Sequence, residues 1–342
     1  EITCRDWSSD VCSSDLRIGG FMFSINQQAV KIVKEKILPF AEQLNCQVHH
    51  LKNGATVVDM GVEAPGGFLA GKLLVEATIG GMGHVDFGQF HLGELHFPSI
   101  DVYIDRPVEA TLSSQFSGWK MPGKDIPGYI NPIGSGPARA IARNDIFSQS
   151  WHYQDIHHET VFAAQTQEIP DESVAEMVAE ACKIQPENVY ILATKTASLT
   201  GSIQVCSRTV EASVWRLYRK GFDIAKIISG MGTCPIAPPI KDELLAMDRV
   251  NTALLYGVTV RYVVDCSDEE ILAVVDEAPF SASRRYGERF IDIFEEGHRD
   301  FYVVDKDIHT VAKYEFMNYN TGSMFTGGKL REDLITESFY RK

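Results

Sequence analysis

The sequence lacks several features that would place it in common functional classes. No stretch approaches the roughly 18 consecutive apolar residues of a membrane-spanning helix. No run of Lys or Arg interrupts a chain of net charge −14, which argues against nucleic acid or an anionic membrane as the main partner. No Cys-x-x-Cys pair occurs, and the widely spaced cysteines are typical of reduced thiols in a cytoplasmic protein.

Three catalytic signatures are also missing. The chain has no Gly-x-Ser-x-Gly elbow for a nucleophilic serine, no His-Glu-x-x-His zinc motif, and no phosphate loop ending in Gly-Lys-Ser/Thr. His84, His91 and His96 lie close together in sequence and raise the possibility of a metal site. His91 and His96 would point to opposite faces of a single strand, and we expect no metal there.

The first 16 residues, EITCRDWSSDVCSSDL, follow neither helical nor strand periodicity and lack the apolar segment of a secretory signal. The string RDWSSDVCSSDL matches one reading frame of a common sequencing adapter. We therefore interpret residues 1–21 as a non-native leader ahead of Met22; the alternative is a short disordered native tail. The four acidic residues and one basic residue of 1–16 contribute −3 to the net charge, which leaves −11 for the remainder.

What remains has the composition of an ordinary globular protein, with 44% hydrophobic and 23% charged residues. Strand and helix patterns mix without a strict alternation, which predicts an α+β fold of layered sheets and helices. A Pro- and Gly-rich stretch at 120–137 suggests an inter-domain crossing. We place an N-terminal domain at 22–148 and a C-terminal domain at 149–340.

The predicted elements follow from hydrophobic period and from capping and turn residues. Helices are expected at 24–45 with a kink at Pro39, from 170 onward, within 198–221, at 244–255 and at 268–277. Strands are expected at 55–59, 99–104, 161–166, 188–194, 257–266, 303–305 and 312–318.

Two segments are candidate sites. In the helix expected at 201–218, Gln204, Arg208, Glu211 and Trp215 follow spacings of four, three and four and so share one face. From these residues alone, a solvated ion pair on a helix surface is the commoner explanation. The segment IGSGPARA contains Gly134, Ser135, Gly136 and Arg139, which can present N–H groups and a cation to an anion, although a tight turn before a helix explains it as well.

Taken in order, six segments resemble the methenyltetrahydromethanopterin cyclohydrolase family from about Met22 to Tyr340. They are LKNGATVVD, PGGFLAGK, IGSGPARA, ASLTGSIQVCSRTVE, PIAPP and SASRRY. The resemblance implies hydrolysis of N5,N10-methenyltetrahydromethanopterin to the N5-formyl form without a metal or redox cofactor. It also implies two α/β-type domains with the pterin carrier in the cleft between them, and a homotrimer.

The same resemblance implies that Arg208 and Glu211 are the catalytic Arg-x-x-Glu pair. It makes Gly134, Ser135, Gly136 and Arg139 candidates for a cleft wall that binds substrate. Trp119, Ser202, Gln204 and Trp215 are further wall candidates, with Trp119 or Trp215 suited to stacking on a pterin. Phe116, Ser117 and residues 120–129 depart from the archaeal pattern, which bears on the variant of the carrier and not on the reaction.

The chemistry needs a water molecule aimed at an electrophilic carbon and a base to take its proton. We expect Glu211 to be this base, and Arg208 to hold Glu211 in position and keep its pKa low. Two alternatives remain open at this point. One is a phosphate- or nucleotide-binding transferase that uses Gly134–Arg139, and the other is a pterin-binding protein without catalytic activity.

Overall fold

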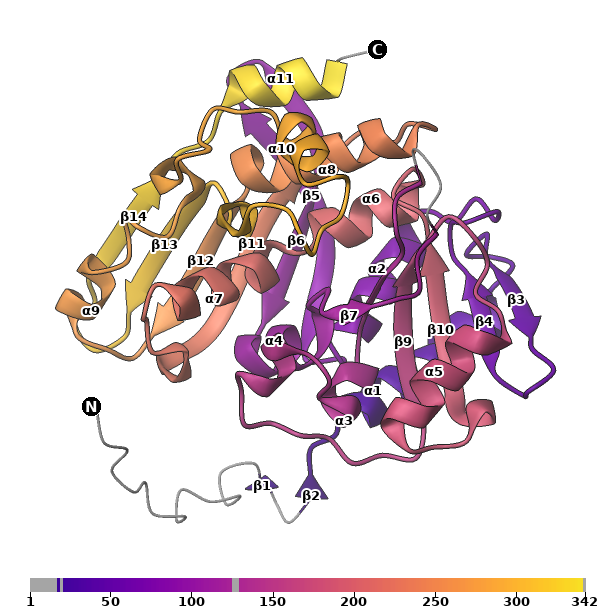
Figure 1. Ribbon diagram of the computed structural model, residues 1–342. Helices are drawn as coiled ribbons and strands as arrows, with labels where there is room; N and C mark the ends of the chain where they lie inside the picture. The colour runs from indigo at the N-terminus through magenta and orange to yellow at the C-terminus, as the bar shows by residue number, and fades with distance from the viewer. Residues whose placement is uncertain (1–16, 19–20, 125–128, 341–342) are drawn as a thin grey trace, which may run out of the picture.

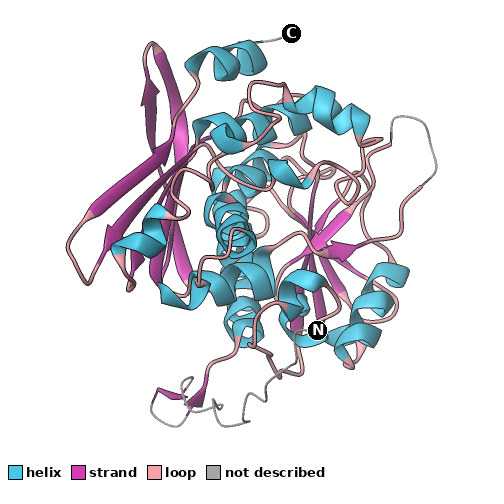
Figure 2. Ribbon diagram, turned by 60° about the vertical axis from the view of Figure 1, so that its left-hand side comes forward, coloured by secondary structure: helices cyan, strands magenta, loops and turns pink. Residues whose placement is uncertain are grey.

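The computed structural model describes residues 17–18, 21–124 and 129–340. Residues 1–16, interpreted above as adapter-derived, lie outside the described residues. Two six-stranded sheets dominate the chain, with helices between them and on their outer faces (Figures 1 and 2). The predicted α+β class of layered sheets and helices is confirmed.

The first sheet has a parallel centre and antiparallel edges. Strand β10 lies between β4 and β9 and is parallel to both. Strand β3 joins one edge, and β8 and β7 extend the other, all in antiparallel pairings. In spatial order the strands are β3 (Gln47–His50), β4 (Thr56–Asp59), β10 (Val189–Thr194), β9 (Thr160–Gln165), β8 (Ile133–Ser135) and β7 (Trp119–Lys120).

The second sheet is antiparallel except for the parallel pair β12 and β13. In spatial order it contains β14 (Met324–Gly328), β13 (Lys313–Asn318), β12 (Thr259–Val264), β11 (Ile227–Pro235), β6 (Leu95–Ile104) and β5 (Gly83–Leu92). A separate ladder pairs β1 (Arg17–Ile18) with β2 (Phe21–Met22).

The chain crosses between the sheets more than once. Strands β5 and β6 precede the boundary placed at 148/149 yet lie in the second sheet, whereas β9 and β10 follow it and lie in the first. The two sheets therefore do not coincide with the segments 22–148 and 149–340. Whether those segments fold independently stays a prediction.

Helices fill the space between the sheets, where α2 packs against α6, and α6 against α8. Gly71 of α2 permits the first of these contacts, because a Cβ there would lie 2.8 Å from Ile203 Cγ2 of α6. The α-helices are α1 (Ile25–Ile32), α2 (Phe68–Thr78), α3 (Ala138–Ala142), α4 (Ile146–Gln149), α5 (Glu172–Cys182), α6 (Leu199–Cys206), α7 (Thr209–Arg219), α8 (Glu243–Gly257), α9 (Asp268–Leu272), α10 (Phe290–Glu296) and α11 (Glu332–Tyr340). Shorter helical turns are η1 (Val33–Ile37), η2 (Leu38–Phe40), η3 (Glu109–Gln115), η4 (Pro186–Asn188), η5 (Ile224–Lys226), η6 (Phe280–Ala282) and η7 (Lys306–Ile308).

Three predicted elements need correction. The helix expected over 24–45 is regular only to Ile32; it then widens into a π turn and tightens into a 3₁₀ turn at Pro39, which cannot continue an α-helical hydrogen-bond ladder. The strand expected at 303–305 is wrong, because this segment turns into η7. The helix expected at 268–277 ends at Leu272. No helix among the described residues is long and apolar enough to cross a membrane.

Candidate active site

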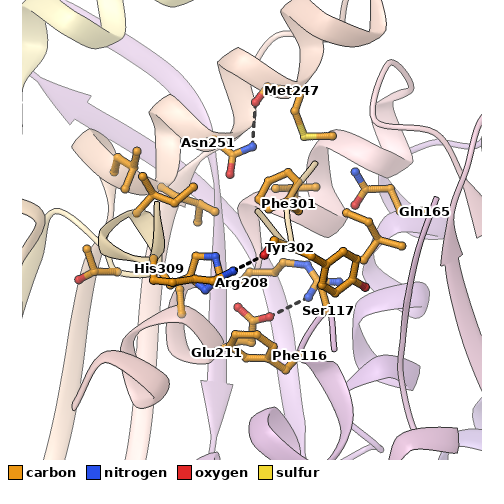
Figure 3. Close-up of a pocket in the computed structure, with 18 of the residues that line it drawn as sticks. Phe116, Ser117, Gln165, Arg208, Glu211, Met247, Asn251, Phe301, Tyr302 and His309 are labelled. Atoms are coloured by element: carbon orange, nitrogen blue, oxygen red, sulfur yellow. Dashed lines mark hydrogen bonds and ion pairs between the residues drawn. The ribbon is translucent and has the colours of Figure 1, made fainter. Parts of the chain in front are cut away.

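A pocket of about 830 Å³, including its open mouth, lies beyond the carboxyl end of β9, between the two sheets (Figure 3). In sheets with parallel strands, ligand pockets gather at the carboxyl ends of the strands. The lining comes from seven parts of the chain: Phe116 and Ser117; Ile133; Phe147; Gln165; Val205 through Ala212 with Arg208 and Glu211; Met247 through Leu255; and Phe301 through Thr310.

The helix expected within 198–221 is broken at the pocket. Helix α6 ends at Cys206, and α7 starts at Thr209, because Arg208 has a ψ of 28° and leaves the helical conformation. Glu211 then falls in the first turn of α7, where a carboxylate is favoured by the helix dipole. The break turns Arg208 and Glu211 toward the pocket.

Arg208 and Glu211 form an ion pair that is nearly closed to solvent. The distance from Arg208 Nη1 to Glu211 Oε1 is 2.9 Å, and the side chains are 8% and 7% exposed. The explanation of this pair as a solvated surface contact is therefore wrong. Three more acceptors fix the guanidinium: Gln204 Oε1 at 2.7 Å, the Gln115 carbonyl at 2.7 Å and Ser135 Oγ at 3.3 Å.

Burial dominates the acidity of Glu211. Removal from water raises the pKa of the Glu211 carboxyl above its usual value near 4.5. The positive charges of Arg208 and Arg139 and a hydrogen bond donated by the Ser117 amide act in the opposite direction without cancelling the rise. The sequence-based expectation that Arg208 keeps this pKa low is corrected, because the cost of burial exceeds the effect of the ion pair.

Gln204 does not line the pocket but fixes Arg208 through a hydrogen bond outside the lining. It accepts the bond from Arg208 Nε and donates through Nε2 to Gln165 Oε1 at 3.2 Å. Gln165, which lines the pocket, donates in turn to Thr196 Oγ1 at 2.6 Å. This chain of bonds connects Arg208 to the carboxyl ends of β9 and β10 and restricts its guanidinium to one orientation.

The segment Gly134–Arg139 is built into the fold. Ser135 contacts Arg208, and Gly136 has a φ of +98°, a conformation that favours glycine. Arg139 is fully buried, and its guanidinium donates to the Asp145 carboxylate and to the carbonyls of Ser114 and Leu112. Its donors therefore face protein acceptors, and the guanidinium does not border the pocket.

The other predicted wall residues lie near the pocket but outside its lining. Trp119 packs edge-on against Phe162 in the core of the first sheet, and a Cβ at Gly134 would collide with the Phe162 ring. Ser202 donates to the Ala237 carbonyl at 2.6 Å and is buried. Trp215 lies behind the lining, 4.6 Å from the Phe147 ring centroid.

An aromatic wall in front of Trp215 was missed from the sequence. Phe116 and Phe147 stack with ring centroids 3.8 Å apart, and both line the pocket. Phe116 follows η3 and Phe147 lies in α4, 31 positions away, so no local period could have grouped them. Phe116 lies next to Glu211 (Figure 3).

The segment 301–310 was also missed as part of the site; only 303–305 was assigned a structure, that of a strand. It brings Phe301, Tyr302, Lys306 and His309 to the pocket. Burial lowers the pKa of His309 to about 4, helped by the nearby charges of Lys306 and Arg219, so its imidazole is neutral at pH 7. Burial also raises the pKa of Tyr302, which keeps its hydroxyl protonated.

The three histidines of the sequence cluster lie on the β5–β6 hairpin, away from this pocket. His91 and His96 pair directly across the two strands, with Nδ1 atoms 2.7 Å apart, so they share a face. The expectation of opposite faces is wrong because the chain reverses between them at Gly93. In the described part of the chain, no three His, Cys, Asp or Glu side chains gather as a metal-binding group.

Comparison with known proteins covers nearly the whole chain. Residues 24–339 match the family model described as Cyclohydrolase (MCH). The methenyltetrahydromethanopterin cyclohydrolase of Methanospirillum hungatei is 34% identical over 319 residues, which cover 93% of this chain and 99% of that protein. The proteins of the same name from Methanothermobacter marburgensis and Methylobacillus flagellatus are 35% and 32% identical, over 93% and 92% of this chain and 99% and 95% of theirs.

Proposed function

The chain belongs to the cyclohydrolase family of the methenyltetrahydromethanopterin cyclohydrolases, and from this membership we propose how its pocket performs the reaction. The enzyme hydrolyses N5,N10-methenyltetrahydromethanopterin, opening the one-carbon bridge to give the N5-formyl form. The observation that carries the proposed mechanism is the ion pair of Arg208 and Glu211, which is shielded from solvent yet lines the pocket.

The methenyl carbon is bonded to two nitrogens that share a positive charge, so it is already an electrophile. Glu211 orients a water molecule and accepts its proton as the water oxygen adds to this carbon. The adduct is neutral and carries a hydroxyl group. Glu211 then returns the proton to N10 as the C–N10 bond breaks and its electron pair stays on N10. The hydroxyl loses its own proton as the formyl C=O forms, so the reaction releases one proton in total.

The raised pKa of Glu211 suits both steps. A carboxylate with a higher pKa is a stronger base toward water, and once protonated it is an acid of strength closer to neutral pH. Arg208 serves as a positioning residue: its bonds to Gln115, Ser135 and Gln204 fix the guanidinium, which in turn fixes the carboxylate. The ion pair also moderates the attraction between Glu211 and the cationic substrate, which would otherwise stabilise the ground state.

The aromatic wall supplies the surface on which a flat pterin can stack. Phe116 and Phe147 lie beside Glu211 in the lining and take the role that the sequence suggested for Trp119 or Trp215. We expect no metal or redox cofactor to be required, because the substrate carbon needs no further polarisation. The nucleotide-loop alternative is not favoured, since Arg139 already binds Asp145.

We also propose a homotrimer in the cytoplasm. The family resemblance supports the trimer. Location in a reducing compartment is supported by the free thiols at Cys46, Cys182, Cys206, Cys234 and Cys266.

The purified protein, mixed with methenyltetrahydromethanopterin, tests the proposed function through the loss of the near-ultraviolet absorbance of the methenyl form. We expect decay well above the spontaneous rate, unchanged by a chelator. Decay that stops on chelation would contradict the metal-free mechanism. No decay above background would favour the pterin-binding protein without activity.

A further inference from the structure

His91 and His96 lie side by side near the tip of the hairpin formed by β5 and β6. They occupy directly opposite positions of the two antiparallel strands, and the chain reverses between them at Gly93, whose φ is +55°. Side chains at opposite positions of such a pair point to the same face, with Cβ atoms about 4.5–5.5 Å apart. The two imidazoles can therefore reach one point above that face of the hairpin.

The ring nitrogens are already close to a chelating separation. The Nδ1 atoms of His91 and His96 are 2.7 Å apart, the ring centroids are 4.7 Å apart, and the ring planes meet at 77°. Imidazole nitrogens bind Zn²⁺ at about 2.0–2.1 Å, so two nitrogens at right angles on one ion lie about 2.9 Å apart. A small rotation of the rings is enough to turn both Nδ1 lone pairs toward the same ion.

We propose that His91 and His96 bind a divalent transition-metal ion of the class of Zn²⁺, Ni²⁺ and Cu²⁺ through their Nδ1 atoms. Imidazole is a ligand that suits these ions. The inference goes beyond the proposed function and does not depend on it, because neither histidine belongs to the pocket lining. The sequence-based reason against a metal here was that the two side chains point to opposite faces, and the strand pairing removes that reason.

Metal binding replaces the contact between the two rings. In the free protein one Nδ1 donates its proton to the other, because two lone pairs would repel each other at 2.7 Å. In the complex both Nδ1 atoms donate lone pairs to the ion, and the displaced proton moves through solvent to Nε2 of the same ring. Both residues are exposed, so water can occupy the remaining positions around the ion. With two protein ligands, the site binds reversibly and yields its ion to a chelator.

His84, the third histidine of the sequence cluster, has different surroundings. Its ring nitrogens lie 2.9 Å from the Glu76 carboxylate and 3.4 Å from that of Asp86. The Lys72 ammonium lies among the same groups, 3.2 Å from Glu76 Oε1 and 3.3 Å from His84 Nε2. A cation already held at this point repels a metal ion. His84 is therefore not part of the proposed site.

The bound ion connects two strands close to a contact with the C-terminal helix α11 (Figure 1). In the turn of the hairpin, the Glu94 amide donates to the Glu332 carboxylate of α11 at 3.1 Å. Next to His96, the Phe97 ring packs edge-on against Phe339 of the same helix. An ion that binds the folded protein stabilises it in proportion to the logarithm of its concentration, so Ni²⁺ should raise the temperature of thermal unfolding.

Calorimetric titration of the full chain with Ni²⁺, after purification without a histidine tag, tests the proposal. The wild type should bind Ni²⁺, and His91→Asn and His96→Asn should each weaken this binding at least about 10-fold, because one of two protein ligands is lost. His158→Asn is the matched control, since His158 is also exposed and adjacent to a histidine, but His157 Nδ1 contacts the Glu159 carbonyl at 3.0 Å. Its affinity should equal that of the wild type.

Electron paramagnetic resonance of bound Cu²⁺ counts the nitrogen ligands directly. The wild type and His158→Asn should show two coupled nitrogens, and His91→Asn and His96→Asn should show fewer. A wild type that binds no Ni²⁺ up to about 1 mM, or equal affinity in the wild type, His91→Asn and His96→Asn, would overturn the inference. Failure of the wild type to open the methenyl bridge would overturn the proposed function alone, because metal binding is measured separately from turnover.

Discussion

Among the described residues, the pairs Arg139–Asp145 and Arg208–Glu211 are almost closed to solvent, and they differ in what surrounds the carboxylate. In the pair of Arg139 and Asp145, the Asp145 carboxylate receives two bonds from the guanidinium and further bonds from the Phe147 and Ser148 amides and the Ser148 hydroxyl. In the pair of Arg208 and Glu211, the carboxylate receives one guanidinium bond and the Ser117 amide, and the rest of it faces a pocket.

The acidities differ accordingly. Arg139 and the Ser148 bonds outweigh the burial of Asp145, and its pKa is lowered below 3.8. Burial prevails at Glu211, and its pKa is raised. Asp145 is saturated with hydrogen bonds and holds Arg139 in the fold. The Glu211 carboxylate is only partly bonded, as the proposed role of a base requires.

The largest expected difference between the pairs is in turnover. Glu211→Gln should lower kcat about 100- to 10,000-fold, the usual contribution of a general base, with KM nearly unchanged. Initial rates of methenyl loss measure this effect. Asp145→Asn is the matched control and should leave kcat of the folded enzyme within about twofold of the wild type. Unchanged turnover in Glu211→Gln would remove Glu211 from the mechanism.

The next largest difference is in stability. Asp145→Ala leaves the Arg139 guanidinium buried without its counter-ion and should lower the free energy of unfolding by about 3–5 kcal/mol. Urea unfolding followed by tryptophan fluorescence measures the loss. Glu211→Gln also leaves a buried guanidinium without its counter-ion, but it keeps an acceptor for Arg208 and removes a carboxylate whose burial is unfavourable, so its loss of stability should be smaller. Equal destabilisation of the two variants would contradict the contrast between the pairs.

The pH dependence of stability should separate the pairs in sign. The lowered pKa of Asp145 contributes stability that is present above pH about 3.8 and is lost as pH falls toward the folded-state pKa, so Asp145→Asn should flatten the acid limb. The raised pKa of Glu211 costs stability as pH rises from about 4.5 through the folded-state pKa, so Glu211→Gln should gain on the wild type over that range. Thermal unfolding from pH 3 to 8 records both trends, and parallel curves for the two variants would refute them.

The smallest effects concern the residues that support each pair. Gln204→Ala removes the acceptor of Arg208 Nε and should lower kcat about 10-fold with little change in KM, because the guanidinium loses a charged hydrogen bond. Ser148→Ala removes one bond from Asp145 and should cost about 1 kcal/mol of stability without affecting kcat. Kinetics and unfolding curves of both variants are needed, and a kcat loss in Ser148→Ala equal to that in Gln204→Ala would contradict the division of roles.

Several helices and strands could be predicted directly from the sequence, because the patterns that indicate them lie within a few residues. Strands β4, β9, β10, β12 and β13 and helices α5 and α8 were predicted within a few residues. Their apolar periods and capping residues, such as Asp171 before α5, act between near neighbours in the chain. The spacing of Gln204, Arg208 and Glu211 was visible for the same reason, and these three side chains do meet.

Other features depended on contacts between distant segments. The break between α6 and α7 places Arg208 against Gln115 and Ser135, which lie 93 and 73 positions away, and no period within 198–221 signals it. The pairing of His91 with His96 required the reversal at Gly93, and the crossing of β5 and β6 into the second sheet required the partners β11 to β14.

The sequence by itself therefore determined the α+β class, several regular elements and, through family resemblance, the reaction; that Arg208 and Glu211 are its catalytic pair stays a prediction. Only the tertiary structure decided which polar groups bond to other groups of the protein and which face the pocket. Arg139 and Arg208 both follow small residues in the sequence. The Arg139 guanidinium is fully bonded to Asp145 and to backbone carbonyls, whereas the pair of Arg208 and Glu211 borders a pocket. Burial and hydrogen-bond saturation depend on where distant segments pack, and these two quantities set the pKa and the reactivity of each group.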